Sequence, residues 1–506
     1  MYFNSKIYRI VIFLLCVHLL PIKANDDKVL GRIISLSQDT TVYEVLNVIG
    51  DSIGFYFSYN AALFNANRKV KIQARNETVI QILDDLFKQD TMNYKVIGNQ
   101  IVINKPVPQI HDKKEVKSVP VNFAISGKVL DKQTGLPIPF ATIGIPEKMN
   151  WTVCNFEGRF NLNIKNPGPS DTLQISCLGY KSIKLPYTQI EMLIDHTFLL
   201  SADYISIQEV IIRKIDPKTL IEEAIKKIKD NYTPWPFIFE GFYRETIQKN
   251  TKYVSVSEAF VSGKKAGYRN AAGHDIIKLE KGRKIVDDQR NDTVILKLQA
   301  GMYNSMQLDI LKNRADFLNP EFFPDYNYKV SDLILSDNRY VYVIEFNRSG
   351  TSKYAMYKGK IYIDYDNAAI LNIEFSLNSY GLKSASDFLI LKKPHGIKID
   401  AVGSMYDISY ILGEDSLYYL NYIMSESAFK VKKRKQLFNC TYTIRSEVAI
   451  TSVKDGLSKD FDKDQIATRK DVFTEQVTTY DPDFWKEYSY IPPDKSLLEA
   501  VLEYKD

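Results

Sequence analysis

Alternating apolar and polar residues dominate the second half of the chain. Between 369 and 377, apolar side chains recur at every second position, and the intervening positions include Asn372, Glu374 and Ser376. The segment 358–364 precedes this run, and the turn at 365–367 joins the two, which indicates an antiparallel hairpin with one apolar and one wet face. Similar runs occur at 330–336, 340–346, 388–392, 398–403, 418–425 and 442–450. We therefore expect a large curved antiparallel sheet over 237–450.

The region 28–105 has a different, compact α+β pattern. Thr41 and Glu44 form a capping box for a first helix, whose apolar stripe runs to Gly50, and Asn76 is the expected cap of a second helix. The remaining strands end in a hairpin that turns on Gly98-Asn99. The expected order is β-α-β-β-α-β-β.

This region resembles the secretin and TonB short N-terminal domain. The likeness rests on 37–42, 55–59, 79–86 and 94–103. The resemblance implies a periplasmic module that passes a signal by touching a protein partner. The alternative is that the same fold only spaces other domains.

Between 125 and 180 short strands alternate with tight turns. The turn Asp131-Lys132-Gln133-Thr134-Gly135 follows the first strand, and Pro137 and Pro139 force an extended path into an edge strand at 140–145. Further strands follow the turns at 155–158 and near 171. Turn signals about every ten residues predict a β-sandwich.

The order of these pieces resembles the carboxypeptidase-regulatory-like domain, a transthyretin-like sandwich. Its signature corresponds here to Gly127-Lys128-Val129, Asp131, Gly135, Pro137, Ala141-Thr142, the run 155–160 and Leu178-Gly179-Tyr180. Cys154 departs from the polar residue usual before the glycine turn. The resemblance implies an accessory domain without catalytic residues.

Seven segments make up the expected organisation. They are a signal peptide at 1–24, the secretin/TonB-like domain at 28–105, a proline-bearing linker at 106–121, the sandwich at 122–204, a connecting strand and helix at 205–236, the antiparallel sheet at 237–450, and a polar, partly helical tail at 451–506. Asp216 and Pro217 begin the connecting helix, which we expect to pack on its own domain rather than in a partner's groove.

The first 24 residues predict export. Lys6 and Arg9 precede the apolar run 10–20, and Ala24 offers a small residue for cleavage. That run is shorter than the roughly twenty residues a membrane anchor needs. Cys16 follows Leu15, whereas a lipobox has a small residue before its cysteine, so lipidation is not expected. We expect a protein of the periplasm or the outer-membrane periphery.

Composition excludes several classes of function. The formal charge is +5, and removal of three cations in the leader leaves a value near +2, which gives no reason to expect a nucleic-acid partner. Five histidines and four cysteines supply few metal ligands. Cys154 and Cys177 lie in the same sandwich, so they could form one disulfide, but we prefer two buried free thiols. Cys440 lies far away in the sequence, and we expect it to be a buried free thiol as well.

The chain has no recognisable catalytic motif, so we expect no catalytic, metal or cofactor-binding residue and no cofactor. It lacks the spacings of zinc peptidases, serine hydrolases and phosphate-binding loops. The cluster Phe242-Tyr243-Arg244-Glu245 and the pair Ser257-Glu258 fit a cross-strand ion pair better than a catalytic site.

Two functions remain open. The favoured one is a non-enzymatic envelope protein of a Bacteroidetes-like bacterium, which binds protein partners and is accessory to TonB-linked uptake or signalling. The alternative is a carbohydrate-active or other hydrolase, which a cleft with two facing carboxylates would favour. The chain after Ser201 is too short for a transporter barrel of about twenty-two strands. The hairpin at 358–364 resembles half-barrels of envelope lipoprotein carriers; a closed core without a cavity is the alternative.

Overall fold

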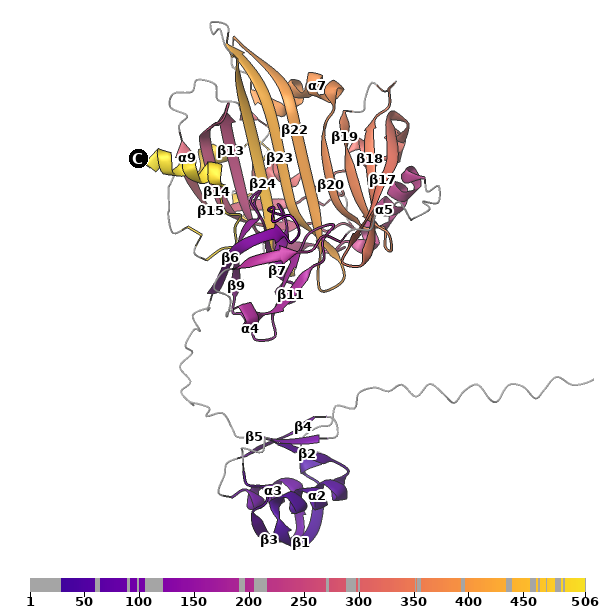
Figure 1. Ribbon diagram of the computed structural model, residues 1–506, viewed down its shortest axis with the longest axis vertical. Coiled ribbons are helices and arrows are strands. Elements are labelled where there is room, and N and C mark those ends of the chain that lie inside the picture. Colours follow the sequence, from indigo (N-terminus) through magenta and orange to yellow (C-terminus); the bar gives the residue numbers. More distant parts are fainter. Residues whose placement is uncertain are drawn as a thin grey trace, which may run out of the picture. The chain divides into compact units, whose positions relative to one another are not determined.

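The chain divides into two compact units in the computed structural model, residues 1–118 and 119–506 (Figure 1). The structure describes residues 29–59, 64–88, 92–97, 100–104, 122–190, 196–203, 216–269, 273–287, 297–298, 301–350, 352, 356–392, 396–433, 439–455, 461–462, 465–469, 471–477, 484–485 and 487–505. The expected leader, the linker at 106–121, the strand at 205–213 and the turn Gly98-Asn99 lie outside these residues.

The first unit has the expected order of elements. They are β1 (Ile33–Thr41), α2 (Val42–Ile53), β2 (Tyr56–Tyr59), β3 (Lys69–Thr78), α3 (Val79–Leu86), β4 (Asn93–Ile97) and β5 (Gln100–Asn104). β1 pairs with β3, and β5 lies between β2 and β4. The apolar stripes of both helices are buried in one core, so the helical period identified the packed faces correctly.

Two helix ends differ from expectation. α2 continues past Gly50 and ends at Gly54, whose φ of 76° suits a residue without a side chain. Gly50 is needed for another reason: a Cβ there would lie 2.5 Å from the Phe55 carbonyl oxygen. α3 is capped by Thr78, which forms a reciprocal capping box with Gln81, and not by Asn76.

The second unit begins with the sandwich, which is confirmed. Its elements are β6 (Asn122–Asp131), β7 (Thr142–Ile145), η1 (Pro146–Lys148), β8 (Asn150–Val153), β9 (Arg159–Lys165), β10 (Thr172–Ser176), β11 (Ile183–Pro186), α4 (Tyr187–Ile190) and β12 (Thr197–Leu200). One sheet has the order β12-β6-β9 and the other β11-β10-β7-β8. β7 therefore lies inside its sheet, and the expectation of an edge strand at 140–145 was wrong.

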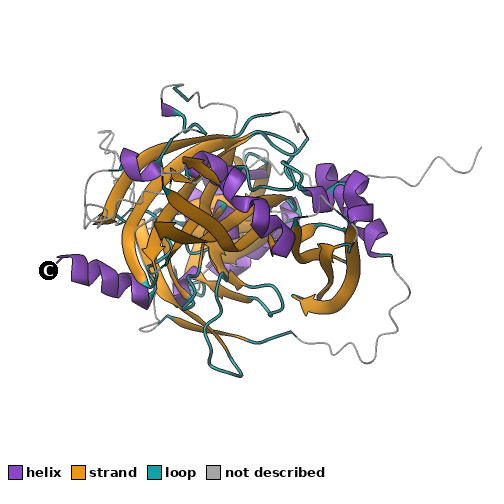
Figure 2. Ribbon diagram, turned by 90° about the horizontal axis from the view of Figure 1, so that it is seen from above, coloured by secondary structure: helices purple, strands orange, loops and turns teal. Residues whose placement is uncertain are grey.

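A large antiparallel sheet follows, and its strands curl in Figure 2. Its order is β15 (Ile276–Asp287), β14 (Lys252–Lys265), β13 (Phe237–Lys249), β24 (Cys440–Asp455), β23 (Tyr418–Lys433), β22 (Ile397–Leu412), β20 (Ile370–Leu377), β19 (Tyr357–Asp364), β18 (Arg339–Arg348) and β17 (Tyr326–Ser336). The bridge between Ser452 of β24 and Asn150 of β8 joins it to one sandwich sheet. The mainly β, multidomain fold class is thus confirmed.

One face of the large sheet, the inner face, carries the main core. It packs against α5 (Pro217–Asn231), α6 (Met302–Met306), η4 (Asp316–Leu318) and η5 (Pro320–Asp325). Asp216 caps α5, and Ile221, Ala224 and Ile228 are buried in this core, so the helix packs on its own domain as expected.

Further along the chain, residues 379–389 form α7 (Ser379–Leu389), and only β21 (Ile390–Lys392), paired with β16 (Lys297–Leu298), remains of the strand expected at 388–392. Asn378 explains the helix, because its side chain accepts hydrogen bonds from the backbone of Tyr380 and Gly381.

The tail packs on both faces of the sheet: Ala467, Phe473 and Val477 join the inner core, and a later segment crosses the other, outer face. We call residues 484, 485 and 487–495 the strap; α8 (Phe473–Gln476) precedes it and α9 (Lys495–Lys505) follows it. The strap contacts both domains: the Tyr490 amide donates to the Asn161 carbonyl, and Arg244 donates to the Ile491 carbonyl. None of the helices in the described residues has the length and apolar character to cross a bilayer.

Candidate functional site

The polar cluster found in the sequence is structural. Arg244 and Glu258 are register partners on β13 and β14, and the guanidinium donates to the carboxylate at 2.8 and 2.6 Å. Both are buried beneath the strap, which confirms the expected cross-strand ion pair. Glu245 and Ser257 are also register partners, but alternation places them on the inner face. The four residues therefore form no common site.

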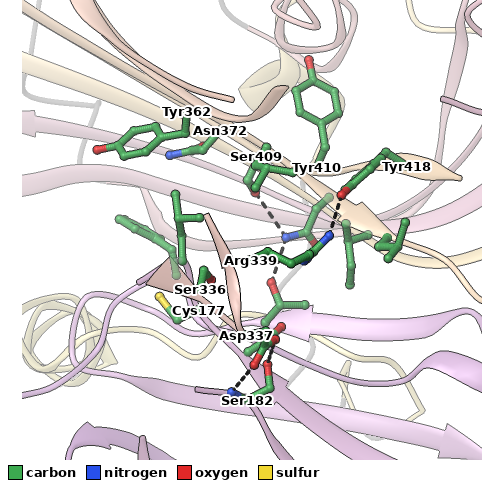
Figure 3. Close-up of a pocket in the computed structure, with 18 of the residues that line it drawn as sticks. Cys177, Ser182, Ser336, Asp337, Arg339, Tyr362, Asn372, Ser409, Tyr410 and Tyr418 are labelled. Atoms are coloured by element: carbon green, nitrogen blue, oxygen red, sulfur yellow. Dashed lines mark hydrogen bonds between the residues drawn. The ribbon is translucent and has the colours of Figure 1, made fainter. Parts of the chain in front are cut away.

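A cleft separates the sandwich from the outer face of the sheet. It has a volume of about 1190 Å³, and a second hollow of about 880 Å³ shares part of its lining. Figure 3 shows residues from both walls, with Ser182 of the sandwich bonded to Asp337 at the β17–β18 turn. The backbone N–H of Ser182 donates to Asp337 at 2.6 Å, so this contact ties the two walls together.

Both walls of the cleft carry buried polar atoms that lack partners. Within the described residues, Asn150 Oδ1 and Trp151 Nε1 of β8 and Asn372 Oδ1 and Asn421 Oδ1 of the large sheet have no hydrogen-bond partner. Trp151 and Asn421 are only 2% and 3% exposed. Because an unpaired buried polar atom costs roughly 1–3 kcal/mol, four such atoms around one cleft point to a binding site.

Charged residues form one continuous row across the outer face. Each residue is the register partner of the next, in the order Lys329, Glu345, Lys360, Glu374, Asp407, Met424, Glu447, Arg244, Glu258, Arg283. We call this the charge row. Its first five residues line the cleft hollows, and Arg244, Glu258 and Arg283 lie next to the strap. The open part of the row is therefore the floor of the cleft.

Two carboxylates are adjacent in this floor. Glu374 on β20 faces Asp407 on β22, and the Tyr362 hydroxyl donates to Glu374 at 3.1 Å. Burial, reinforced by the negative charge of Glu374, raises the pKa of Asp407 to about 7, although a hydrogen bond from Asn372 opposes the shift. Asp407 therefore holds a proton more readily than an isolated aspartate would.

The cleft also contains a thiol. Cys177 lines both hollows, and burial, with the charge of Asp407, raises its pKa to about 12. Cys154, Cys177 and Cys440 are all free thiols in the structure, so no disulfide joins the two sandwich cysteines. A thiol with a raised pKa is a poor nucleophile at neutral pH. Cys177 is therefore not a catalytic candidate.

The paired carboxylates do not flank a substrate position. Glu374 and Asp407 lie side by side on neighbouring strands of one wall. The sandwich residues described around the cleft include Lys184 but no aspartate or glutamate. Hydrolysis by two carboxylates requires them on opposite sides of the scissile bond. Among the described residues, no group of three or more His, Cys, Asp or Glu side chains could hold a metal ion.

Sequence reasoning placed part of this site correctly without recognising it. Alternation assigned Asn372 and Glu374 to the wet face of their hairpin, which is the face that lines the cleft. No local pattern indicated that the sandwich covers this face. Asp407 belongs to β22, which the expected strand at 398–403 covered only in part.

Comparison with known proteins identifies one domain. Residues 125–212 match the family model of the CarboxypepD_reg-like domain, which supports the resemblance drawn from the sandwich motifs. No curated protein matches the sequence. The match covers the sandwich and does not include the strands of the cleft floor.

Similar solved structures are remote. One is a DUF1329 family protein from Desulfovibrio piger ATCC 29098, with 11% identity, coverage of 48% of this chain and 96% of the other, and a TM-score of 0.21. Another is a protein of unknown function from Bacteroides fragilis NCTC 9343, described as membrane-associated, with 7% identity, coverage of 66% and 99%, and a TM-score of 0.13. At these scores neither likeness establishes a shared fold.

The pKa of Asp407 gives a stability prediction. This pKa is higher in the folded chain than in the unfolded one. The contribution of Asp407 to the free energy of unfolding is therefore complete below about pH 4 and is lost as the pH rises through about 7. Asp407→Asn is therefore expected to stabilise the chain at pH 8 by on the order of 1–3 kcal/mol, with little difference at pH 4. Denaturant unfolding at both pH values measures this, and an equal effect at the two would contradict it.

Proposed function

We propose that this chain is a non-enzymatic binding protein of the bacterial cell envelope and that its cleft takes up a segment of a protein partner. The observation that carries the proposal is the set of unpartnered buried polar atoms on both walls of a 1190 Å³ cleft. A bound segment would satisfy these atoms, and the strap and the Ser182–Asp337 contact would hold the walls in position.

The location in the envelope rests on the sequence. The leader at 1–24 supports export, and the sequence motifs of the first unit resemble those of the secretin and TonB short N-terminal domain. We propose that this unit contacts a second envelope protein and that the chain is accessory to TonB-linked uptake or signalling. N-terminal sequencing of the exported protein, which should begin near Asn25, tests the leader separately.

Site-specific crosslinking tests the binding role. A photoreactive phenylalanine analogue replaces Tyr362, which lines the cleft, or Tyr365, which is 54% exposed and lies outside the described lining. After irradiation of the native envelope, position 362 is expected to capture a discrete partner that position 365 does not capture. Identical products from the two positions would contradict the proposal.

A blocking variant links the captured partner to the cleft. Ser409→Tyr places a ring on the cleft floor, and Val402→Tyr adds the same ring at an exposed position of the same strand. Ser409→Tyr should abolish the crosslink from position 362, and Val402→Tyr should leave it intact. Retention of the crosslink in Ser409→Tyr would show that the partner binds elsewhere.

A hydrolase remains the second candidate because the cleft does contain the carboxylate pair Glu374 and Asp407. Their place on one wall makes this candidate weaker, since no described acid faces them from the sandwich. Turnover of envelope glycans or peptides by the purified chain, abolished by Glu374→Gln, would establish the hydrolase instead of the binding protein.

A further inference from the structure

The charge row lacks one cation. Along most of its length acids and bases alternate, so each carboxylate has a cation as a direct neighbour on the adjoining strand. At Glu374 and Asp407 two carboxylates are neighbours, and the next residue after Asp407 is the uncharged Met424. The described row contains five acids and four bases. The deficit lies in the open cleft and not under the strap.

The neighbouring cation of the row, Lys360, does not correct the deficit. Lys360 is the register partner of both Glu345 and Glu374, but its ammonium lies 3.7 Å from Glu345, and no ion pair is formed with Glu374. Glu374 accepts from the Tyr362 hydroxyl instead. Among the described residues, neither Glu374 nor Asp407 has a cationic partner within 4 Å. Glu374 is exposed and Asp407 is half-buried, and two carboxylates side by side are unfavourable unless a proton or a cation is shared between them.

The unpartnered atoms in the cleft also require donors. Asn372 lies two residues before Glu374 on the same face, and its Oδ1 has no partner among the described residues. Asn421 uses its Nδ2 to donate to Thr142 and Ser409, which leaves its Oδ1 as a second open acceptor. These oxygens are acceptors, so a group rich in N–H donors fits this floor better than an anion does.

An apolar region adjoins the acid pair. The second hollow shares Glu374 and Asp407 with the first and is also lined by Phe140, Phe156 and Met405. Trp151 on the sandwich wall offers a buried N–H without an acceptor among the described residues. A peptide supplies all of these complements, because its backbone donates and accepts and its side chains combine apolar and cationic groups.

We propose that the cleft binds a peptide segment whose basic side chain, a lysine ammonium or an arginine guanidinium, is held between Glu374 and Asp407, with apolar neighbouring residues in the adjoining hollow. This assignment rests on the proposed binding function and names its ligand chemistry. The bound cation completes the charge row. Glu374 and Asp407 are then binding residues and not catalytic ones.

Three matched probes test the ligand chemistry on the purified full chain. They are capped tripeptides in which phenylalanine flanks lysine, arginine or glutamine, titrated calorimetrically at pH 7.5. The lysine and arginine peptides are expected to bind at least about tenfold more tightly than the glutamine peptide, because the cation forms charge-assisted hydrogen bonds. Equal affinities, or no binding of either basic peptide at millimolar concentration, would overturn the proposal. Tighter binding of glucosamine than of the lysine peptide would overturn it in favour of an amino sugar.

Variants locate the cation. Glu374→Gln combined with Asp407→Asn should remove the preference for the basic peptides. Asp332→Asn, which neutralises another exposed acid of the same cleft, should preserve that preference. An equal loss in both variants would show attraction by the general charge of the cleft and would overturn the proposal. Thermal unfolding verifies that each variant is folded.

The pH provides an independent readout. Asp407 faces Glu374 and Asn372 on β20, and its charge also acts on Tyr362, Tyr422 and the thiol of Cys177. A proton and the cation compete for the pair, so affinity for the lysine peptide should fall as the pH is lowered from 8 to 6. The double variant should lack this change, and a pH-independent affinity in the wild type would contradict the assignment.

The experiments distinguish failure of the proposed binding function from failure of the proposed cationic ligand. If position 362 crosslinks a partner while the basic and neutral peptides bind equally, the binding function stands and the cationic ligand is wrong. If neither position 362 nor the peptides give a specific result, both proposals are wrong.

Discussion

Replacing Glu258 with Gln is expected to lower the free energy of unfolding by roughly 3–5 kcal/mol. The Glu258 carboxylate is fully buried and accepts from Arg244 at 2.6 Å, from Arg283 at 2.8 Å and from the Trp485 indole at 2.8 Å. The neutral amide no longer balances the positive charges of the Arg244 and Arg283 guanidinium groups. Removing one partner of a buried ion pair is strongly destabilising because it leaves the other charge uncompensated. Chemical denaturation at pH 7 measures the loss.

The same site gives a pH signature. Burial acts to raise the pKa of Glu258, but Arg244 and Arg283 outweigh it and hold the pKa below its usual value. Because the pKa is lower in the folded chain, the stabilising contribution of the Glu258 carboxylate is present above the ordinary value near 4.3. This contribution is lost as the pH falls through the folded pKa. The difference between wild type and Glu258→Gln should therefore narrow in acid.

A surface pair provides the control for Glu258. Asp400 lies 3.0 Å from Lys398, with side chains that are 53% and 71% exposed, and Asp400→Asn should change stability by less than about 1 kcal/mol. Losses of similar size in Glu258→Gln and Asp400→Asn would show that burial does not set the energy of these pairs.

Replacing Lys265 with Met is expected to cost roughly 3–5 kcal/mol on the inner face. The Lys265 ammonium has no exposed surface and lies 2.7 Å from Asp275 and 2.5 Å from Asp309. Asp309 also accepts from the hydroxyls of Tyr268 and Tyr410 at 2.8 Å. Two hydroxyl donors do not replace a lost cation, so the variant buries an unbalanced carboxylate. Denaturant unfolding, followed by intrinsic fluorescence, provides the measurement.

A double variant separates this cause from lost packing. Adding Asp309→Asn to Lys265→Met removes the unbalanced charge, so the double variant should be less destabilised than the sum of the two single variants. Lys278→Met, which breaks the half-buried pair with Glu280 at 3.1 Å, should cost less than about 1 kcal/mol. If the destabilisations of Lys265→Met and Asp309→Asn simply added in the double variant, the two residues would not be energetically coupled.

Local patterns predicted much of the fold. Period-two alternation identified β18, β19 and β20, and helical spacing with Asp216 and Pro217 identified α5, because each signal depends on neighbours in sequence. The same reasoning missed α7, whose cap Asn378 follows directly on β20, and the true length of β22. The sequence pattern placed the end of α2 at Gly50, whereas this glycine is needed because of its close contact with Phe55. Hydrophobic periodicity carries no information about such a contact.

These local patterns did not predict the candidate site, and the reason is physical. Glu374 and Asp407 become neighbours only through the pairing of β20 with β22, which skips α7 and β21. The cleft arises because the sandwich, which ends about 170 residues before Glu374, lies over that pairing. Arg244 and Glu258 were easier to connect, since consecutive strands place them opposite each other.

The strap also imposes an order on biosynthesis. Lys495 donates its backbone N–H to Glu157, 338 residues earlier, and Trp485 reaches Glu258 across 227 residues. During synthesis from the N-terminus, the sandwich and β13–β15 therefore leave the ribosome long before the segment that covers them exists. Their outer faces, with Phe242 and Arg244, stay open throughout that interval. Because the covering segment is made last, the apolar surface of these faces is open to misassembly during synthesis until the strap covers it.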